Sequence, residues 1–341
     1  MPLPFYTSEG LAIATYHVLV SDSVHPSAIE ILQRAGGLSV TAPDQVDRAT
    51  LMSQIGEADG LIIRSATRAD AALLAAAQRL KVIARAGAGV DNVDIEAANQ
   101  RGIVVMNTPG GNTIAAAEHT FGLMLALLRH LPAAHESMRA GRWERQAFMG
   151  VELRGKTLGI IGLGRIGKAV AKRARAFEMT VIAYDSDQSE AEVQAARELG
   201  VEMVPLAEVY ARSDVITLHP SLNDQTRGLI NVHSLAQMKR GVYLVNTARG
   251  ALIVDSDLAD ALRSGQVAGA ALDVYTEEPP RQDHPLIGLP NVVHTPHLAA
   301  STVDAQIAVA VEAAHLVADA LLRGQYRNVV NPEILGQVHT R

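Results

Sequence analysis

Short apolar segments of strand type alternate with helix-forming segments along most of this chain, and they do so in two series. A strand, a helix and a second strand form the unit that builds parallel sheets, because parallel neighbours need a crossover connection between them. The helices then cover both faces of the sheet. Two such series predict two doubly wound α/β domains, which suits 341 residues at roughly 150 per domain.

The first series lies between residues 16 and 108. Its expected strands are Tyr16–Asp22, Gly60–Ser65, Lys81–Gly87 and Ile103–Pro109, and its expected helices are Pro26–Ala35, Ala69–Gln78 and Asp94–Arg101. The leader Met1–Thr15 has no clear periodicity, so we expect a peripheral tail there.

The second series follows a long helix, Asn112–Arg129, whose almost uniformly apolar surface predicts burial. After it come a segment at Pro132–Gly141 and an irregular stretch, Arg142–Val151, with the only tryptophan. The expected strands are Thr157–Gly162, Thr180–Asp185, Val215–His219, Val242–Thr247, Ala268–Val274 and Val292–His294. A last helix, Thr302–Arg323, is expected to return to the first domain. The predicted domains are therefore 16–108 plus 299–330, and 109–298.

Composition narrows the partners and the chemistry. The net charge of −6 and the lack of basic runs argue against nucleic acid, which needs a clustered basic face. We find no apolar stretch of the roughly 20 residues that span a bilayer, and no signal peptide at the start, so no membrane association is expected. Cysteine is absent, which excludes disulfides and thiolate chemistry and suits a cytoplasmic location.

The segment Thr157–Gly167 carries the clearest functional signal. It reads as a strand, a turn with Gly162, Gly164 and Gly167, and then a helix. Gly162 would allow the tight turn, Gly164 the approach of a pyrophosphate, and Gly167 close packing of the helix. A G-x-G-x-x-G sequence alone is weak, because glycine-rich turns are common. Here its place between strand and helix predicts a dinucleotide site at the helix N-terminus.

Asp185 ends the next strand, about 20 residues beyond the turn, where this fold needs a carboxylate for the adenosine ribose hydroxyls. A 2′-phosphate would be repelled there, and the residues that follow include no arginine to relieve the repulsion. The sequence therefore predicts NAD rather than NADP as the cofactor.

Three ionisable residues follow strand ends in the same domain. Arg249, Glu278 and His297 would meet at the carboxyl edge of the sheet, where open parallel sheets bind ligands. His297 can take a hydroxyl proton, Glu278 can orient its ring, and Arg249 can bind a carboxylate bidentately and polarise the C2 oxygen. Individually, each could be an ordinary surface or structural residue. Together they suit hydride transfer between nicotinamide and a 2-hydroxy acid.

Two other chemistries are less compatible with these residues. Arginine is a poor neighbour for a metal cation, so we expect no zinc site. The chain has no G-x-S-x-G sequence, which argues against a Ser-His-Asp hydrolase.

The chain resembles the D-isomer-specific 2-hydroxyacid dehydrogenase family from about Val18 to Leu322. The resemblance rests on the glycine-rich turn and on these segments: Arg64–Thr67, Arg85–Asn92, Val105–Pro109, Asn246–Gly250, Glu277–Pro279 and Pro296–Leu298. Gly141–Arg145, Phe148–Gly150 and Asp273–Pro280 are most similar to family members that act on 3-phosphoglycerate.

The resemblance implies roles for individual residues. It implies Arg249 as carboxylate binder, Glu278 as partner of the histidine and His297 as acid/base. Further cofactor contacts would come from Arg165, Ile166, His219, Pro220, Thr247, Ala248, Asp273 and Ala300. Substrate contacts would come from Arg64, Ser65, Gly87, Ala88, Gly89 and Arg145. It also implies a homodimer or homotetramer, with Asn112–Arg129 building the dimer and the segment near Trp143 and Arg145 reaching into a partner subunit.

The sequence departs from the family pattern in three places. His219-Pro-Ser221 replaces the usual His-Thr-Pro, which bears on one backbone contact with the cofactor. Ala299 follows Leu298 where glycine is usual, which would tighten the nicotinamide pocket. The chain also ends before the extra C-terminal regulatory domains of the long forms, so we expect no serine feedback through such a domain.

The predicted function is NAD-dependent oxidation of D-3-phosphoglycerate at C2, the first step of serine biosynthesis. Arg64, Arg68, Arg142 and Arg145 could hold the phosphate, although the last two could equally be solvated. One alternative is a glyoxylate or hydroxypyruvate reductase with the same machinery. Another, from a different class, is an NAD-responsive corepressor that binds peptides, against which the chain offers no disordered interaction tail.

Overall fold

The computed structural model describes residues 15–43 and 46–338, so the expected leader tail lies almost wholly outside the described residues. The chain divides into two compact units, Met1–Asn112 with Val303–Arg341, and Thr113–Thr302. The boundaries at Asn112 and Thr302 fall close to the predicted domain limits. The last long helix belongs to the first unit.

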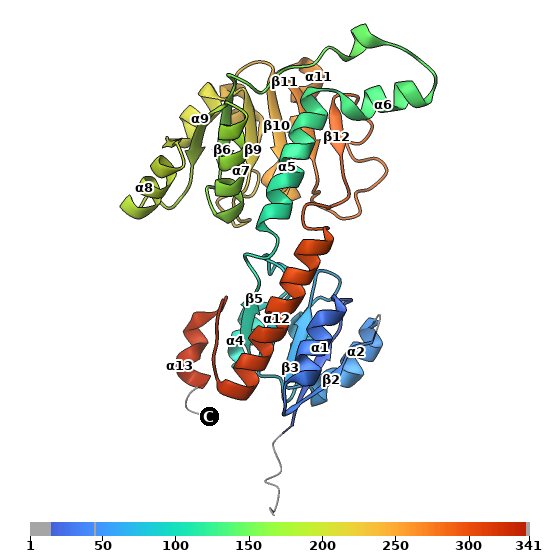
Figure 1. The fold of residues 1–341 in the computed structure, drawn as a ribbon, viewed down its shortest axis with the longest axis vertical. Helices are drawn as coiled ribbons and strands as arrows, with labels where there is room; N and C mark the ends of the chain where they lie inside the picture. Colours follow the sequence, from blue (N-terminus) through green and yellow to red (C-terminus); the bar gives the residue numbers. More distant parts are fainter. Residues whose placement is uncertain (1–14, 44–45, 339–341) are drawn as a thin grey trace, which may run out of the picture. The chain divides into compact units, whose positions relative to one another are not determined.

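The first unit, which we call the small unit, is built on a five-stranded parallel sheet (Figure 1). Its strands are β1 (Tyr16–Val20), β2 (Leu38–Thr41), β3 (Gly60–Ile63), β4 (Val82–Arg85) and β5 (Val104–Asn107). The order β2-β1-β3-β4-β5 is the flavodoxin-like arrangement, in which the order of the strands reverses at β1 and β3.

Alternate side chains of these strands form two cores. Val18 and Val20 pack with α1 (Pro26–Arg34) and α12 (Val303–Arg323), whereas Leu19 faces the opposite layer. That layer contains α2 (Arg48–Gln54), α3 (Ala71–Ala76) and α4 (Ile95–Gln100). The short helices η1 (Ile55–Glu57), η4 (Pro332–Ile334) and α13 (Leu335–Val338) complete the unit.

Helix α12 corrects one expectation from the sequence. By length and composition it could cross a membrane, contrary to the expectation that no apolar stretch is long enough. More than half of the segment is buried, and residues such as Val309, Ala313 and Val317 pack in the core of the small unit. Its apolar character therefore reflects its contacts with β3, β4 and α1.

The second unit, the large unit, has a seven-stranded parallel sheet in the order β12-β11-β10-β9-β6-β7-β8. The strands are β6 (Thr157–Ile161), β7 (Thr180–Tyr184), β8 (Val201–Met203), β9 (Val215–Leu218), β10 (Val242–Asn246), β11 (Val267–Leu272) and β12 (Val292–His294). The doubly wound fold class predicted for both units is confirmed by this order and by that of the small unit.

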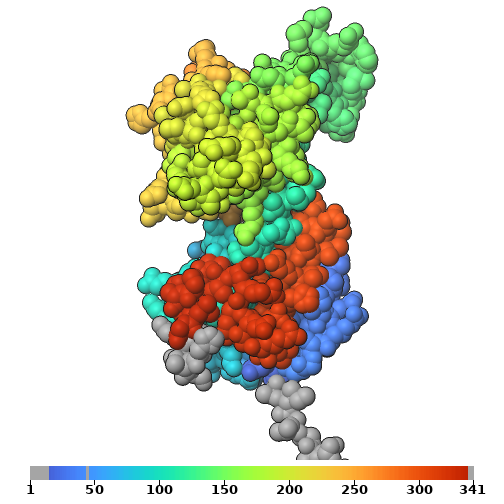
Figure 2. All heavy atoms as spheres, turned by 60° about the vertical axis from the view of Figure 1, so that its left-hand side comes forward, coloured from blue at the N-terminus to red at the C-terminus, as the bar shows by residue number. Residues whose placement is uncertain are grey.

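The sheet of the large unit lies between two helical layers. One layer has α5 (Thr113–Leu128), α7 (Arg165–Ala176) and α8 (Glu190–Glu198), and the other has α9 (Leu206–Arg212), α10 (Val232–Gln237) and α11 (Asp255–Ser264). The segment formed by α6 (Leu131–Arg139) and η2 (Arg145–Phe148), which we call the arm, extends from this unit (Figures 1 and 2). A further short helix of this unit is η3 (Gly250–Leu252).

Helix α5 is less buried than its composition suggested. Residues including Phe121 and Met124 are buried, but Ile114 is 55% exposed and Leu125 is only partly covered. One face of α5 packs on the sheet and on α7, whereas Ile114, Glu118 and Gly122 on another side of the helix are exposed. The prediction of burial is therefore confirmed for the face on the sheet and wrong for these three positions.

Candidate active site

The glycine-rich turn between β6 and α7 has the geometry that its sequence predicts. Gly162 has φ of 93°, in the left-handed region, and a Cβ atom there would lie 2.5 Å from the backbone nitrogen of Pro220. A Cβ atom at Gly167 would lie 2.2 Å from the carbonyl oxygen of Gly162. A side chain at Gly162 would push the turn away from the segment of Pro220, and one at Gly167 would push the helix away from the turn. Only glycine allows both close contacts.

Gly164 differs from the other two glycines, because a Cβ atom there would meet no heavy atom within 4 Å. It is the N-cap of α7, and no side chain caps the first turn of that helix, which begins with Arg165, Ile166 and Gly167. Backbone N–H groups at a helix start attract anions. The open approach at Gly164 and the uncapped helix start thus fit a bound pyrophosphate.

Asp185 lies beside this turn at the end of β7. Its Oδ2 accepts a hydrogen bond from the backbone nitrogen of Leu163 at 2.6 Å, and its Oδ1 accepts one from Asp187 at 2.9 Å. These two bonds hold the carboxylate next to the glycines. Its place at the adjacent strand end is the one that a ribose-binding carboxylate needs.

His219 and Pro220 follow β9 and approach the same turn. The backbone nitrogen of His219 donates to the carbonyl of Ile161 at 2.7 Å, and Nε2 of its ring lies 2.9 Å from Oγ1 of Thr217. Burial lowers the pKa of His219 to about 4, so its ring is neutral at physiological pH. The close approach of Pro220 to Gly162 places this segment at the predicted cofactor site.

The segment from Asn246 to Gly250 carries Arg249 past the end of β10. The side chain of Asn246 closes this turn, because it accepts from the nitrogen of Ala248 at 3.0 Å and donates to the carbonyl of Arg249 at 2.9 Å. Nη1 of Arg249 donates to the carbonyl of Ala248 at 2.7 Å. Thr247 is buried, and its hydroxyl lies 2.8 Å from that of Thr120.

Gly250 brings the Arg249 turn against the segment that carries Glu278. A Cβ atom at Gly250 would lie 2.0 Å from the carbonyl carbon of Tyr275. The two backbones therefore touch, and any side chain at Gly250 would separate them. Asn246 and Gly250, the first and last residues of the Asn246–Gly250 motif, thus have structural roles that the motif alone did not predict.

Glu278 and His297 form a direct pair. Nδ1 of His297 lies 2.7 Å from Oε2 of Glu278, and Oε1 of Glu278 accepts from the backbone nitrogen of Tyr275 at 3.1 Å. The side chain of His297 is 47% exposed and that of Glu278 is 38% exposed. His297 has φ of 54°, a left-handed conformation that is uncommon for a residue other than glycine.

Asp273 holds the segment that carries His297. Its carboxylate is buried and accepts hydrogen bonds from the nitrogens of Leu298 and Ala299, both at 2.8 Å, while its carbonyl accepts from the nitrogen of His297 at 2.7 Å. Burial raises the pKa of Asp273, but the hydrogen bonds, led by those from the side chains of His119 and Thr295, lower it below its usual value overall.

Protein donors surround the carboxylate of Asp273, so this side chain holds the segment of His297 in place. The contact of Asp273 with the cofactor stays a prediction. Ala300, another predicted cofactor residue, follows directly in the same segment and is partly buried.

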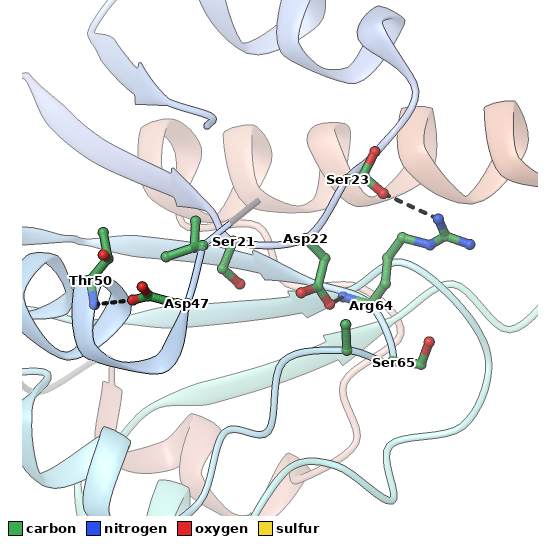
Figure 3. A pocket seen from close by; sticks show the side chains of 9 residues that line it. Ser21, Asp22, Ser23, Asp47, Thr50, Arg64 and Ser65 are labelled. Atoms are coloured by element: carbon green, nitrogen blue, oxygen red, sulfur yellow. Dashed lines mark hydrogen bonds between the residues drawn. The ribbon is translucent and has the colours of Figure 1, made fainter. Parts of the chain in front are cut away.

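Predicted substrate residues of the small unit lie at the carboxyl ends of neighbouring strands. Arg64 and Ser65 follow β3 and line a cavity of about 560 Å³, together with residues that follow β1 and residues at the start of α2 (Figure 3). Asp22 stabilises this segment, because its Oδ2 accepts from the nitrogens of Arg64 at 2.6 Å and Thr67 at 3.1 Å. Arg64 itself donates to the carbonyl of Ser23 at 3.1 Å.

The loop of Gly87, Ala88 and Gly89 follows β4, the strand next to β3. Gly87 has φ of 150°, and a Cβ atom there would lie 1.5 Å from Nη1 of Arg85. The carbonyl of Ala88 accepts from the side chain of Asn107 at 2.6 Å. The sheet of the small unit thus places both predicted substrate segments at one edge.

Arg145, the remaining predicted substrate residue, lies in the arm of the large unit and is exposed. Arg142 is paired with Glu144, whose carboxylate lies 3.1 Å from its Nε, and Trp143 is 75% exposed. The arm and the pair of Glu278 and His297 thus come from separate segments of the large unit.

Comparison with known proteins assigns the fold and site to a family. Residues 121–299 match the family described as D-isomer specific 2-hydroxyacid dehydrogenase, NAD binding domain. A structure of the TT0316 protein from Thermus thermophilus is 38% identical, with a TM-score of 0.82, over 92% of this chain and 99% of that one. The chain belongs to the D-isomer specific 2-hydroxyacid dehydrogenase family, and its large unit is the NAD-binding domain.

Curated relatives are more specific in name. D-3-phosphoglycerate dehydrogenase from Archaeoglobus fulgidus is 47% identical over 92% of this chain, and that from Homo sapiens is 48% identical over 93%. The chain spans 59% of the length of each of these relatives. A structure of a glyoxylate reductase from Paecilomyes thermophila is 31% identical, with a TM-score of 0.85, over 94% of this chain and 99% of that one.

Proposed function

We propose that this protein oxidises D-3-phosphoglycerate to 3-phosphohydroxypyruvate with NAD. The observation that carries the proposal is the pairing of His297 with Glu278 in a chain 47% and 48% identical to two enzymes named D-3-phosphoglycerate dehydrogenase. NAD, when bound at the glycine-rich turn, supplies the acceptor for the hydride from C2.

The roles of the side chains follow from their hydrogen bonds. Because Nδ1 of His297 faces Glu278, Nε2 is the nitrogen that remains for the substrate. A proton on Nδ1 directed at the carboxylate leaves a lone pair on Nε2, which can take the proton of the C2 hydroxyl. Glu278 orients the ring and compensates the positive charge that forms. Arg249 binds the substrate carboxylate as a planar fork.

Charge complementarity favours a phosphorylated substrate. Arg64 at the cavity of the small unit and Arg145 on the arm are guanidinium groups that can bind phosphate. Asp185 supports a preference for NAD over NADP, since a carboxylate repels a 2′-phosphate. The lack of cysteine is compatible with the reducing cytoplasm that we expect for this protein.

We also propose a homodimer or homotetramer. Leu131, Met138, Trp143 and Met149, in and beside the arm, are each more than half exposed, as is Ile114 on α5. Large apolar side chains grouped in this way usually mark an interface, and a second copy of the chain would cover both surfaces.

The test is a spectrophotometric screen of the purified chain. We expect NADH to be consumed with 3-phosphohydroxypyruvate, with a kcat/KM about tenfold or more above those for glyoxylate and hydroxypyruvate, because a phosphate pocket should contribute at least about 1.4 kcal/mol. A preference for glyoxylate would favour the reductase alternative. Failure to consume NADH with any 2-oxo acid would contradict both and favour an NAD-responsive binding protein.

A further inference from the structure

Two adjacent residues of α5, His119 and Thr120, contact the two segments that carry the catalytic side chains. His119 reaches the segment with His297, and Thr120 reaches the segment with Arg249. All of these residues belong to the large unit.

The contact of His119 is with the carboxylate beneath His297. Its Nε2 lies 3.1 Å from Oδ1 of Asp273 and 3.1 Å from Oγ1 of Thr295. The hydroxyl of Thr295 donates to the same Oδ1 at 2.5 Å. An ionised carboxylate oxygen can only accept hydrogen bonds. Nε2 of His119 therefore carries a proton and donates a hydrogen bond to Asp273.

Asp273 transmits this contact to His297. Its side chain is fully buried, and a buried carboxylate is tolerated only when donors surround it. In turn it holds the nitrogens of Leu298 and Ala299, which follow directly after His297. Because His297 has a left-handed backbone, its conformation depends on such contacts on both sides.

Thr120 makes the equivalent contact with the Arg249 segment. It is fully buried, and its hydroxyl donates to the carbonyl of Ala116 at 2.8 Å. The hydroxyl of Thr247, 2.8 Å away, then donates to Thr120. Thr247 lies two residues before Arg249, so a helix turn of α5 fixes the segments of the carboxylate binder and of the acid/base.

We propose that His119 and Thr120 are positioning residues of the active site. His119 orients His297 through Asp273 and Thr295, and Thr120 orients Arg249 through Thr247. The inference rests on the proposed roles of His297 and Arg249, and it assigns one positioning residue to each of them. Loss of His119 affects proton transfer, and loss of Thr120 affects binding of the substrate carboxylate.

The test is a comparison of His119→Leu and Thr120→Val in the full chain. A misplacement of about 1 Å can cost about 100-fold in rate, so we expect His119→Leu to lower kcat by about 10-fold to 100-fold with KM for the 2-oxo acid within about twofold. Thr120→Val should instead raise KM by about fivefold or more with a smaller change in kcat. The variants His119→Gln, which keeps a donor, and Thr120→Ser, which keeps the hydroxyl, should restore most of each loss.

His233→Leu is the matched control, since His233 is an exposed histidine of the same unit on α10. It should leave both constants unchanged. If His119→Leu and Thr120→Val lower kcat and raise KM in the same proportion, and the conservative variants fail to restore them, the residues are merely structural and the proposal is wrong. Wild-type kinetics in both variants would overturn it too.

A second measurement separates this inference from the choice of substrate. In NMR spectra of protein labelled at histidine, the ring signals of His297 should move in His119→Leu and stay in place in His233→Leu, whatever 2-oxo acid the enzyme prefers. Unmoved His297 signals in His119→Leu would overturn the proposal even if 3-phosphohydroxypyruvate is the substrate. If the wild type reduces no 2-oxo acid, the proposed function fails, and the NMR comparison still decides whether His119 positions His297.

Discussion

Nδ1 of His297 lies 2.7 Å from Oε2 of Glu278, although the two residues are 19 positions apart in the sequence. Glu278 is itself held by the backbone nitrogen of Tyr275, so the pair has a fixed partner on the carboxylate side. On the histidine side, the backbone is held by the carbonyl of Asp273. The geometry therefore favours one tautomer of the ring and one direction for its free nitrogen.

The first prediction concerns this pair. Glu278→Gln should lower kcat by about 10-fold to 100-fold, because the ring loses the negative charge that stabilises its protonated state. Steady-state kinetics with NADH and the preferred 2-oxo acid would measure it. Glu277→Gln is the matched control, since Glu277 is the exposed neighbouring carboxylate and should have little effect. Equal losses in the two variants would show that the local charge matters and the pair does not.

The second prediction concerns the cofactor. Asp185→Ser should shift the ratio of kcat/KM for NAD over NADP by about tenfold or more towards NADP, because a 2′-phosphate would no longer meet a carboxylate. Asp187→Ser, two residues further on, removes a similar charge from an exposed position. It should change the ratio much less. An unaltered ratio in Asp185→Ser would show that Asp185 does not set the preference.

The third prediction concerns the phosphate. Arg145→Ala should raise KM for 3-phosphohydroxypyruvate by about tenfold and change KM for glyoxylate little, because only the first has a phosphate for the guanidinium. Arg139→Ala removes a positive charge from the same arm at a residue already paired with Glu136 at 3.0 Å. It serves as the control. Similar changes for both substrates in Arg145→Ala would point to a structural role of the arm.

The sequence was sufficient for most of both sheets because strands such as β3, β6 and β9 are strongly apolar and mostly buried. Each predicted strand exists; most differ from the observed strand at one or both ends, and Val292–His294 is matched at both. The predicted strand at Ala268–Val274, for example, ends at Leu272, because Asp273 turns its carboxylate to the His297 segment. The strands β2 and β8 were missed, since both are short and include half-buried or exposed residues.

The residues of the active site that directly follow strands could be predicted from the sequence. Those that act through contacts with distant parts of the chain could not. The pairing of Glu278 with His297 follows from the motifs, and the structure places the two side chains in contact. The contact of His119 with Asp273 spans 154 residues. No spacing rule relates a helix residue to a loop that far along the chain, so only the packing of α5 against the sheet brings them together.

The last prediction concerns pH and uses His219. Burial lowers its pKa from 6.5 to about 4 in the folded protein, so between these values the unfolded chain binds a proton that the folded chain does not. Its contribution to stability is therefore complete above pH 6.5 and is lost as the pH falls towards 4, by up to about 3 kcal/mol.

Carboxylates with a lowered pKa, such as Asp273, also lose their contribution to stability as the pH falls in the acidic range. A variant is therefore needed to separate the contribution of His219 from theirs. In urea unfolding of the NAD-binding unit within the full chain, the free energy of unfolding of His219→Gln should fall less steeply than that of the wild type between pH 6.5 and about 4. His233→Gln, an exposed position, should follow the wild type. Parallel curves for all three proteins would mean that His219 takes up its proton equally in the folded and unfolded states.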